Sequence, residues 1–299
     1  MSDELLKYQR NSYSQFGEDG VIEEILSRLS PHVALDKWCV EFGAWDGVHL
    51  SNTCTLIRDK GYSAVLIEGD PAKVAQLKLN FPNDNVHKLC RFVHFEGDST
   101  LDNILSETPL PKEFDFLSID IDGVDYYILE GLSIYHPKVI CIEFNPSIPN
   151  LVDFVQPKDF SIKQGSSAKA LNRLAESKGY KLVAATICNL MFVRAELASF
   201  VRSPLPTLDD VNVQGNDPQY LFVGYDGTIL SNKDSVPLPW HDLEIPIENI
   251  QFLPACLRVF GGDYGLTRRL FFYFVILLKT PRLFLTIIRK RLQSRDRSS

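Results

Sequence analysis

The fold of this chain is decided by residues 38–47, WCVEFGAWDG, where an apolar run ends in an acid and two glycines bracket a short turn. Ser51-Asn52-Thr53 then begins a helix, so the pattern predicts a strand, a tight loop and a helix N-terminus. Gly43 and Gly47 allow positive φ and a close approach of the backbone to a ligand. In a parallel α/β sheet this junction binds nucleotide-like ligands. An ordinary glycine turn after a buried strand gives the same pattern, and the stretch alone leaves both interpretations open.

Further short apolar runs follow, and each delivers an acid at its carboxyl end. We expect strands at 64–68, 91–96, 114–122 and 139–143, separated by helices at 53–60, 71–80, from Thr100, and at 125–131. The terminal acids are Glu68, Asp98, Asp120 with Asp122, and Glu143. This alternation predicts a doubly wound, mostly parallel sheet with helices on both faces, and ligands bind outside its carboxyl edge. We therefore expect Glu41, Glu68, Asp98 and Asp120 to surround a common hollow.

Composition and cysteine usage indicate a globular intracellular protein. The 299 residues are 45% hydrophobic and 23% charged, which is enough to bury a full core. Six cysteines are scattered singly, without the pairs of zinc or redox sites, and most lie in apolar runs, as in a reducing compartment. Residues 1–10 are charged and lack an apolar signal-like stretch. We expect a cytoplasmic protein.

The charge is unevenly distributed along the chain. Residues 267–299 hold nine Lys and Arg and one acid, a net of +8, which leaves 22 basic and 37 acidic residues, or −15, for residues 1–266. The acidic body should repel nucleic acid, and the tail should seek anions. The apolar run 270–278 and the run 283–288 are too short to span a bilayer, which needs about 20 residues. They predict a basic, aromatic-rich helix pair on the inner face of an anionic membrane, or, alternatively, helices that pack on the domain with a solvated basic end.

Two other segments leave alternatives open. Residues 18–29 have helical spacing and stop before Pro31, and the acids Glu18 and Asp19 suit the helix N-terminus. The alternative is a lid over the ligand that uses Gln15 or Asp19. Residues 219–230 predict a hairpin on the Asp226-Gly227 turn. The aromatic side chains of this region either form one wall of an acceptor site or are core; they are Tyr220, Tyr225, Trp240 and His241.

The ordered segments VEFGAWDG (40–47), LIEGD (66–70), EGDS (96–99), SIDIDGVDYYILEGL (118–132) and IEFNP (142–146) resemble the FkbM-like branch of Rossmann-type S-adenosylmethionine-dependent methyltransferases. Residues 120–131 are similar to the D-x-E-G-x-E-x-x-x-L-x-G signature of that branch, with Asp in place of Glu. The resemblance covers about residues 14–195 and includes a helix at 166–178, a strand at 179–183 and a final antiparallel strand at 189–193. It implies an α/β fold with a seven-stranded sheet as domain 1–200. Beyond the resemblance, the residues themselves predict a β extension at 201–264 and a basic amphipathic tail at 265–299.

The resemblance also implies site residues and S-adenosylmethionine as the cofactor. Residues facing its amino acid part would be Glu41, Gly43, Ala44, Asp46, Gly47 and Asn52, with Glu68 at the ribose, Asp98 and Ser99 at the adenine, and Asp120 near the methionine ammonium and the transferred methyl. Asp98 is placed equally well to cap the following helix. An acid-lined pocket suits an ammonium and a sulfonium. The absence of G-x-G-x-x-G argues against a pyrophosphate and weakens the oxidoreductase alternative.

By family analogy the expected activity is O-methylation, and a hydroxyl acceptor gains from a base or a metal. The candidates are Asp120, Asp122 and Glu143, with Asp125 and His49 as further ones, although His49 is more simply a loop or core residue. A divalent ion on Asp120, Asp122 and an Asn such as Asn145 is compatible with the pattern, but no motif fixes it, and no metal is predicted. By family analogy the acceptor is a small molecule or a sugar of a lipid-linked or surface glycan precursor. The binding-class alternative is a non-catalytic membrane adaptor that keeps the cofactor fold.

Overall fold

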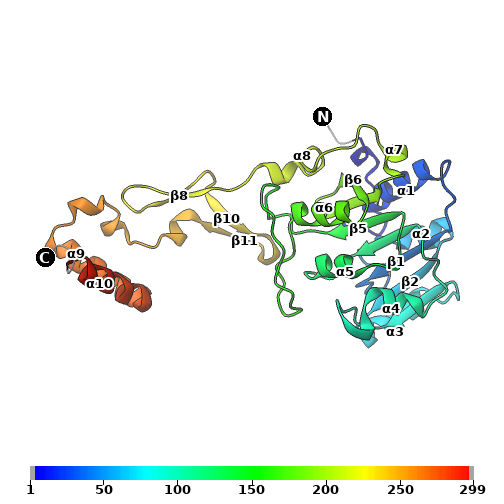
Figure 1. Ribbon diagram of the computed structural model, residues 1–299, viewed down its shortest axis with the longest axis horizontal. Coiled ribbons are helices and arrows are strands. Elements are labelled where there is room, and N and C mark those ends of the chain that lie inside the picture. Colours follow the sequence, from blue (N-terminus) through cyan, green and yellow to red (C-terminus); the bar gives the residue numbers. More distant parts are fainter. Residues whose placement is uncertain (1–3, 296–299) are drawn as a thin grey trace. The chain divides into compact units, whose positions relative to one another are not determined.

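The computed structural model describes residues 4–295, and their side chains as far as residue 289. The chain divides after Pro218 into two compact units, residues 1–218 and 219–299. Unit 1 holds the large sheet with its helices, and unit 2 holds two small sheets and a helix pair. Figure 1 shows the elements of both units in chain order.

Unit 1 is built on one seven-stranded sheet with the order β3-β2-β1-β4-β5-β7-β6. The strands are β1 Trp38–Phe42, β2 Ser63–Glu68, β3 Val86–Cys90, β4 Phe116–Ile119, β5 Val139–Glu143, β6 Tyr180–Ala185 and β7 Asn189–Arg194. All neighbouring pairs are parallel except those of β7, which runs antiparallel to both β5 and β6. The predicted sheet, including its antiparallel last strand, is confirmed.

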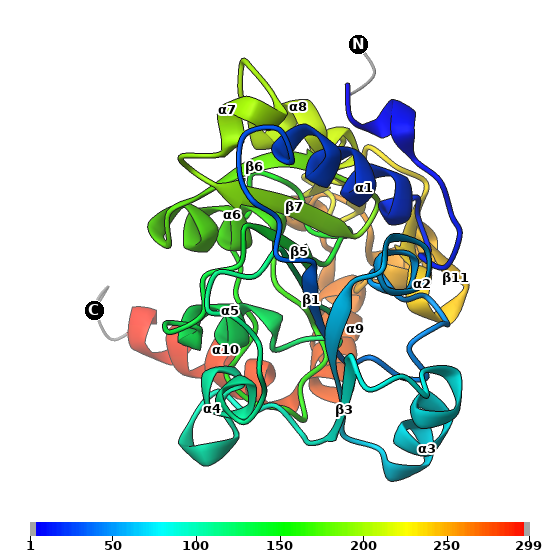
Figure 2. The ribbon, with the colours of Figure 1, turned by 90° about the vertical axis from the view of Figure 1, so that its right-hand side faces the viewer.

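Helices cover both faces of this sheet, as the strand–helix alternation requires (Figures 1 and 2). They are α1 Glu18–Leu29, α2 Cys54–Lys60, α3 Pro71–Asn80, α4 Leu101–Ser106, α5 Asp125–Gly131, α6 Ala168–Ser177, α7 Ala198–Val201 and α8 Leu208–Val211. Their ends follow local chemistry: the Asp70 side chain caps α3 just before Pro71, and Gly61 ends α2 in the left-handed conformation. The predicted helices at 18–29, 53–60, 71–80, 125–131 and 166–178 agree with these bounds to within two residues.

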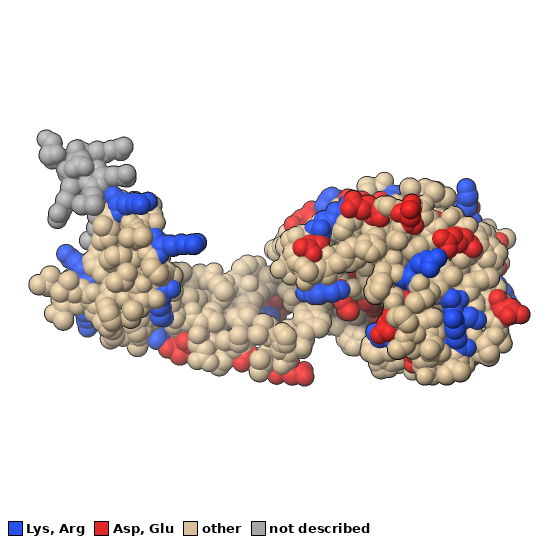
Figure 3. All heavy atoms as spheres, turned by 90° about the horizontal axis from the view of Figure 1, so that it is seen from below, with Lys and Arg blue, Asp and Glu red and all other residues tan. Residues whose placement is uncertain are grey.

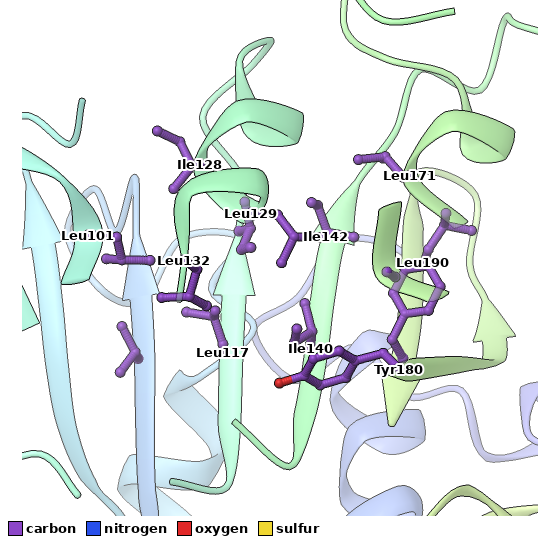
Figure 4. Packing of buried hydrophobic residues seen from close by; sticks show 14 of the residues in the cluster. Leu101, Leu117, Ile128, Leu129, Leu132, Ile140, Ile142, Leu171, Tyr180 and Leu190 are labelled. Atoms are coloured by element: carbon purple, nitrogen blue, oxygen red, sulfur yellow. The ribbon is translucent and has the colours of Figure 1, made fainter. Parts of the chain in front are cut away.

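Alternating side chains of the strands divide the core into two clusters. Val40 and Phe42 of β1 point into one cluster and Cys39 into the other. Figure 4 shows the first cluster, where Leu117 of β4 and Ile142 of β5 lie under Leu129 of α5. Burial on both faces is why these strands are nearly continuous apolar runs.

The third strand was predicted at the wrong place. It is Val86–Cys90 and not residues 91–96, which form a loop. β3 is one of the two edge strands and pairs with β2, and its middle residues His87, Lys88 and Leu89 are half-buried. Its sequence therefore lacks the continuous apolar run of the central strands, and the more apolar loop was mistaken for it.

Unit 2 contains β8 Leu221–Val223 paired with β9 Ile229–Ser231, and β10 Ser235–Leu238 paired with β11 Leu243–Pro246. The predicted hairpin is confirmed: Gly224 N–H donates to the Thr228 carbonyl oxygen at 2.8 Å across the turn that holds Asp226 and Gly227. Tyr220, Tyr225, Trp240 and His241 are all exposed, so the interpretation of these side chains as core is wrong. Their place at an acceptor site stays a prediction.

The tail forms the predicted helix pair, α9 Leu266–Lys279 and α10 Pro281–Arg295. Only Val275 and Ile276 of α9 are buried, and Leu270, Phe274 and Leu278 are 62%, 53% and 66% exposed. Figure 3 shows Lys and Arg projecting from the part that holds these helices, whereas both signs of charge are mixed on the visible face of unit 1. Among the described residues, every helix is too short or too polar to cross a bilayer.

Candidate functional site

A cavity of about 620 Å³ opens at the carboxyl ends of β1, β2, β4 and β5. This volume lies within the range of roughly 300–1,000 Å³ that small-ligand sites occupy. Of the predicted site residues, those that line the cavity are Gly43, His49, Glu68, Asp120, Asp122 and Glu143. The structure therefore brings together acids from three different strand ends, at the edge where the alternation predicted them.

Gly43 makes the first turn of the cavity. Its φ is +72°, and a Cβ built on it would lie 2.2 Å from the Asp120 carbonyl oxygen. Only glycine tolerates both the conformation and the contact. The β1–α2 loop thus passes directly against the end of β4, which brings Asp120 to the floor of the cavity.

Glu41 is not among the residues that line the cavity, and its predicted contact with the ligand stays a prediction. It pairs in the sheet with Ser118 and Leu66, two residues before Asp120 and Glu68, so it lies one strand repeat below the edge. Its buried carboxylate accepts hydrogen bonds from the Asn52 N–H at 2.8 Å and from the hydroxyls of Ser51 and Thr53 at 2.6 and 2.8 Å. Burial raises its pKa and these donors lower it. Glu41 therefore holds the start of α2.

Four other predicted residues of the β1–α2 loop serve structure. Ala44 is buried and its N–H donates to the Ile67 carbonyl oxygen, while Asp46 accepts from the N–H groups of Val48 and His49. A Cβ on Gly47 would collide with Leu77 and Phe81. Asn52 is buried and donates to the Ser118 hydroxyl. None of the four is among the residues that line the cavity.

Asp98 and Ser99 do not line the cavity, and their contact with an adenine ring stays a prediction, whereas the cap weighed for Asp98 is wrong. Asp98 is exposed in the short 3₁₀ turn Gly97–Ser99. The residue that caps α4 is Thr100, whose side chain accepts from the Asn103 N–H. Of the four acids expected around a common hollow, Glu68 and Asp120 line the cavity. Asp122 and Glu143 line it as well.

Glu68 is fixed at the end of β2 with both oxygens aimed at the turn. It accepts the Trp45 N–H at 2.9 Å on one oxygen and the Asp70 N–H at 2.8 Å on the other. Each carboxylate oxygen has a second lone pair, so Glu68 can still accept from hydroxyl groups in the cavity. This geometry suits a ribose diol.

Asp120, Asp122 and Glu143, here called the acid cluster, lie at the ends of β4 and β5, with one oxygen of each within 4.8 Å of the others. Burial, reinforced by the neighbouring carboxylates, raises the pKa of Asp120 to about 8 and that of Glu143 to about 9. A protonated carboxyl of this pair can donate a hydrogen bond to the other. At neutral pH the pair therefore retains a proton. Oxygen ligands at this spacing could also hold a hard divalent cation.

Asp125 is excluded as a base. It is buried and its two oxygens accept the N–H groups of Ile121 and Gly123 at 2.9 and 2.8 Å, so it closes the loop after β4. Burial raises its pKa. That loop places Asp122 at a φ of +57°, a conformation uncommon for residues other than glycine.

Residues 98–182 match the family model of the methyltransferase FkbM domain. The predicted resemblance to FkbM-like methyltransferases is confirmed, and the match includes β4, β5 and the whole acid cluster. No curated protein matches the chain.

Similar solved structures are methyltransferases at low identity. A putative sarcosine dimethylglycine methyltransferase from Galdieria sulphuraria is 14% identical with a TM-score of 0.35, covering 60% of this chain and 67% of its own. A SAM-dependent methyltransferase from Aquifex aeolicus is 13% identical with a TM-score of 0.35, covering 63% and 95%. An amino pentose methyltransferase from Micromonospora echinaspora is 15% identical with a TM-score of 0.38, covering 59% and 89%. These likenesses carry no argument about substrate.

The two acids at the start of α1, Glu18 and Asp19, are structural. Asp19 accepts three successive N–H groups, those of residues 12–14, and the Thr55 hydroxyl, and Glu18 accepts from Thr186 and Asn189. Both are buried. Of the two lid candidates, Gln15 lines the cavity and Asp19 does not.

Several lining residues were missed from the sequence. They are the aromatics Trp45, Phe92 and Phe160 and the cations Lys73, Arg91 and Lys163. One signal was available for Phe92: a Cβ on Gly69 would lie 2.3 Å from its ring, so Gly69 is the residue that lets Phe92 cover the end of β2. Phe160 and Lys163 belong to the loop 144–167 inside the FkbM match, where no periodicity indicates which side chains turn inward.

Proposed function

We propose that this protein is an S-adenosylmethionine-dependent O-methyltransferase. The observation that supports it most is the acid cluster at the floor of a cavity on the carboxyl edge of the sheet, within the segment that matches the FkbM domain. A cavity with four carboxylates suits a ligand that carries an ammonium and a sulfonium.

The donor set of the cavity fits this cofactor. Glu68, oriented by two backbone N–H groups, would accept the ribose hydroxyls. Asp120 would face the ammonium, since it lies against the Gly43 turn. Ile67 and Phe92 give apolar walls on the β2 side, where an adenine ring would lie.

The chemistry needs a base and accurate placement. When bound, S-adenosylmethionine supplies a methyl group activated by its sulfonium. The Asp120–Glu143 pair shares a proton, and an ionised carboxylate of the acid cluster accepts the proton of the acceptor hydroxyl. The cofactor, if held by Glu68 and Asp120, would supply the methyl group for the acceptor oxygen and would retain the electron pair of the carbon–sulfur bond as a neutral thioether. Orientation of the two reactants contributes most of the remaining rate.

The acceptor in this proposal is a sugar hydroxyl on a lipid-linked or surface glycan precursor, by analogy with the family. The exposed apolar side chains of α9 would insert into the cytoplasmic face of an anionic membrane. Arg268, Arg269 and Lys279 of that helix, and Arg282 and Arg289 of α10, have no acid among them within residues 266–289. Each such cation near an anionic surface contributes on the order of 1 kcal/mol.

Calorimetry with S-adenosylmethionine, followed by a methyl-transfer assay on membrane extracts, tests the enzyme. We expect cofactor binding and transfer, with Asp120→Asn inactive but folded and Asp84→Asn, at an exposed site outside the cavity, fully active. Cofactor binding without transfer to any extract would favour the adaptor. Binding of a nicotinamide dinucleotide in its place would favour an oxidoreductase.

Vesicle flotation tests the membrane contact. The wild type should float with vesicles containing phosphatidylglycerol and not with neutral phosphatidylcholine alone. A variant with the five cations Arg268, Arg269, Lys279, Arg282 and Arg289 changed to Gln should stay in solution. Equal flotation of the two proteins would refute the electrostatic contact.

A further inference from the structure

The loop between β5 and α6, residues 144–167, is held as a rigid wall of the cavity. Gln156 is fully buried; its amide donates to the Ile162 carbonyl oxygen at 2.9 Å and accepts from the N–H groups of Gln164 and Gly165 at 3.0 and 2.9 Å. The Tyr127 hydroxyl of α5 donates to the Gln156 carbonyl oxygen at 2.7 Å. These hydrogen bonds fix the loop, so it can hold its side chains in defined positions.

Two side chains of this wall line the cavity, and they have different chemistry. Phe160 stacks on Phe95 with ring centroids 4.8 Å apart and an interplanar angle of 9°, and the His94 ring meets it edge-on at 4.9 Å. Lys163 extends to the end of β4, where its Nζ donates to the Ile121 carbonyl oxygen at 3.1 Å. Ile121 lies between the acids Asp120 and Asp122, so the ammonium is held beside the proposed reacting groups.

The positive charge of Lys163 has no carboxylate partner within the part of the chain that the structure describes. Two more cations line the same cavity, Lys73, whose Nζ lies 4.1 Å above the Trp45 ring, and Arg91, which is 3.5 Å from Glu107. A methyl donor with an ammonium, a sulfonium and a single carboxylate accounts for the acids and for one cation, but not for three. The cations therefore indicate an anionic group on the other reactant.

We propose that the loop 144–167 recognises the acceptor as a phosphorylated sugar, with Phe160 as the platform for the sugar ring and Lys163 as the cation that binds the phosphate. This inference rests on the proposed methyltransferase function and specifies its substrate class. A phosphate carries up to two charges and several acceptor oxygens, and cations from three separate segments suit it better than a single-charged carboxylate. The phosphate can belong to a soluble sugar phosphate or to a lipid-linked one, which present the same group.

Binding of simple probes to the full chain tests the inference. Glucose 1-phosphate, glucose and glucuronic acid are titrated into the protein in the presence and absence of saturating S-adenosylhomocysteine. Glucose 1-phosphate should bind at least about tenfold more tightly than glucose, and the preference should shrink as NaCl rises from about 50 to 300 mM, since exposed charges are screened. Equal affinity for the three sugars, or no binding of any of them, overturns the inference. Tighter binding of glucuronic acid overturns the choice of phosphate.

Matched variants separate the two side chains. Lys163→Gln should remove most of the preference for glucose 1-phosphate, whereas Lys169→Gln, an exposed lysine of α6 outside the cavity, should leave it unchanged. Phe160→Leu should weaken glucose and glucose 1-phosphate by the same factor. Equal behaviour of the two lysine variants would refute the role of Lys163.

Binding of S-adenosylhomocysteine separates a failure of this inference from a failure of the proposed function. Lys163→Gln should bind S-adenosylhomocysteine as the wild type does, and a large loss would show that the lysine serves the cofactor carboxylate, which refutes the inference. Wild-type protein that fails to bind S-adenosylhomocysteine refutes the proposed function, while the preference among the sugars still decides whether the wall binds phosphate.

Discussion

Asp120→Asn should make the protein more stable at high pH while it abolishes methyl transfer. Asp120 is surrounded by carboxylates, with Asp122 and Glu143 offering oxygens within 4.8 Å. Two unit charges at 4.8 Å repel by roughly 1 kcal/mol at the dielectric constant of water and by about 3.5 kcal/mol at an effective value of ~20. The amide of Asn has no charge and can donate to Glu143, so the variant loses the repulsion and keeps a hydrogen bond.

The size of the stabilisation by Asp120→Asn depends on pH. The pKa of Asp120 is raised from 3.8 to about 8 and that of Glu143 from 4.5 to about 9 by burial and the neighbouring acids. The folded protein thus holds protons that the unfolded chain releases, and the free energy of unfolding falls as pH rises from about 4 to about 9. Asp120→Asn should therefore be nearly neutral at pH 5 and stabilising by about 1–3 kcal/mol at pH 9.5.

Thermal unfolding of the wild type, Asp120→Asn and the exposed-site control Asp84→Asn at the two pH values measures this difference. At about 2–4 °C per kcal/mol for a domain of this size, we expect the midpoint of Asp120→Asn to exceed that of the wild type by roughly 2–12 °C at pH 9.5. The control should follow the wild type at both pH values. A variant that is less stable than the wild type at pH 9.5, or a gain of the same size at pH 5, would refute the coupled acid cluster.

Three further predictions concern single side chains. Gly43→Ala should lower the free energy of unfolding by about 1–3 kcal/mol and weaken S-adenosylhomocysteine binding, because its Cβ meets the Asp120 carbonyl oxygen at 2.2 Å; unchanged denaturation and calorimetry would contradict this. Glu68→Gln should raise the dissociation constant for S-adenosylhomocysteine about tenfold with little loss of stability, since a charge-assisted hydrogen bond contributes about 1.5–3 kcal/mol, and calorimetry measures it. Lys138→Met should cost about 3–5 kcal/mol in urea unfolding, because it leaves Asp115, which is fully buried and 2.9 Å from Lys138, without its cation.

The positions of the acids show how far local pattern determines a site. Glu68, Asp120, Asp122 and Glu143 were predicted at one edge because each follows an apolar run, and the carboxyl ends of parallel strands lie together. Glu41 has the same local pattern but lies one repeat lower in the sheet. The register of β1 with β2 and β4 sets how far Glu41 lies from the edge of the sheet. Because this register pairs segments more than 20 residues apart, no sequence pattern near Glu41 indicates it.

The sequence by itself determined the alternation of strands and helices, the Gly43 turn, the helix pair of the tail and the acid-bearing ends of the central strands. These depend on periodicity, capping and turn chemistry within a few residues. Only the tertiary structure decided that β3 lies at an edge of the sheet and which acids face the cavity. It also decided which other side chains line the cavity, namely Lys73, Arg91, Phe160 and Lys163. Those features depend on strand register and on contacts between loops distant in sequence, whose energies come from packing across the fold and not from neighbours along the chain.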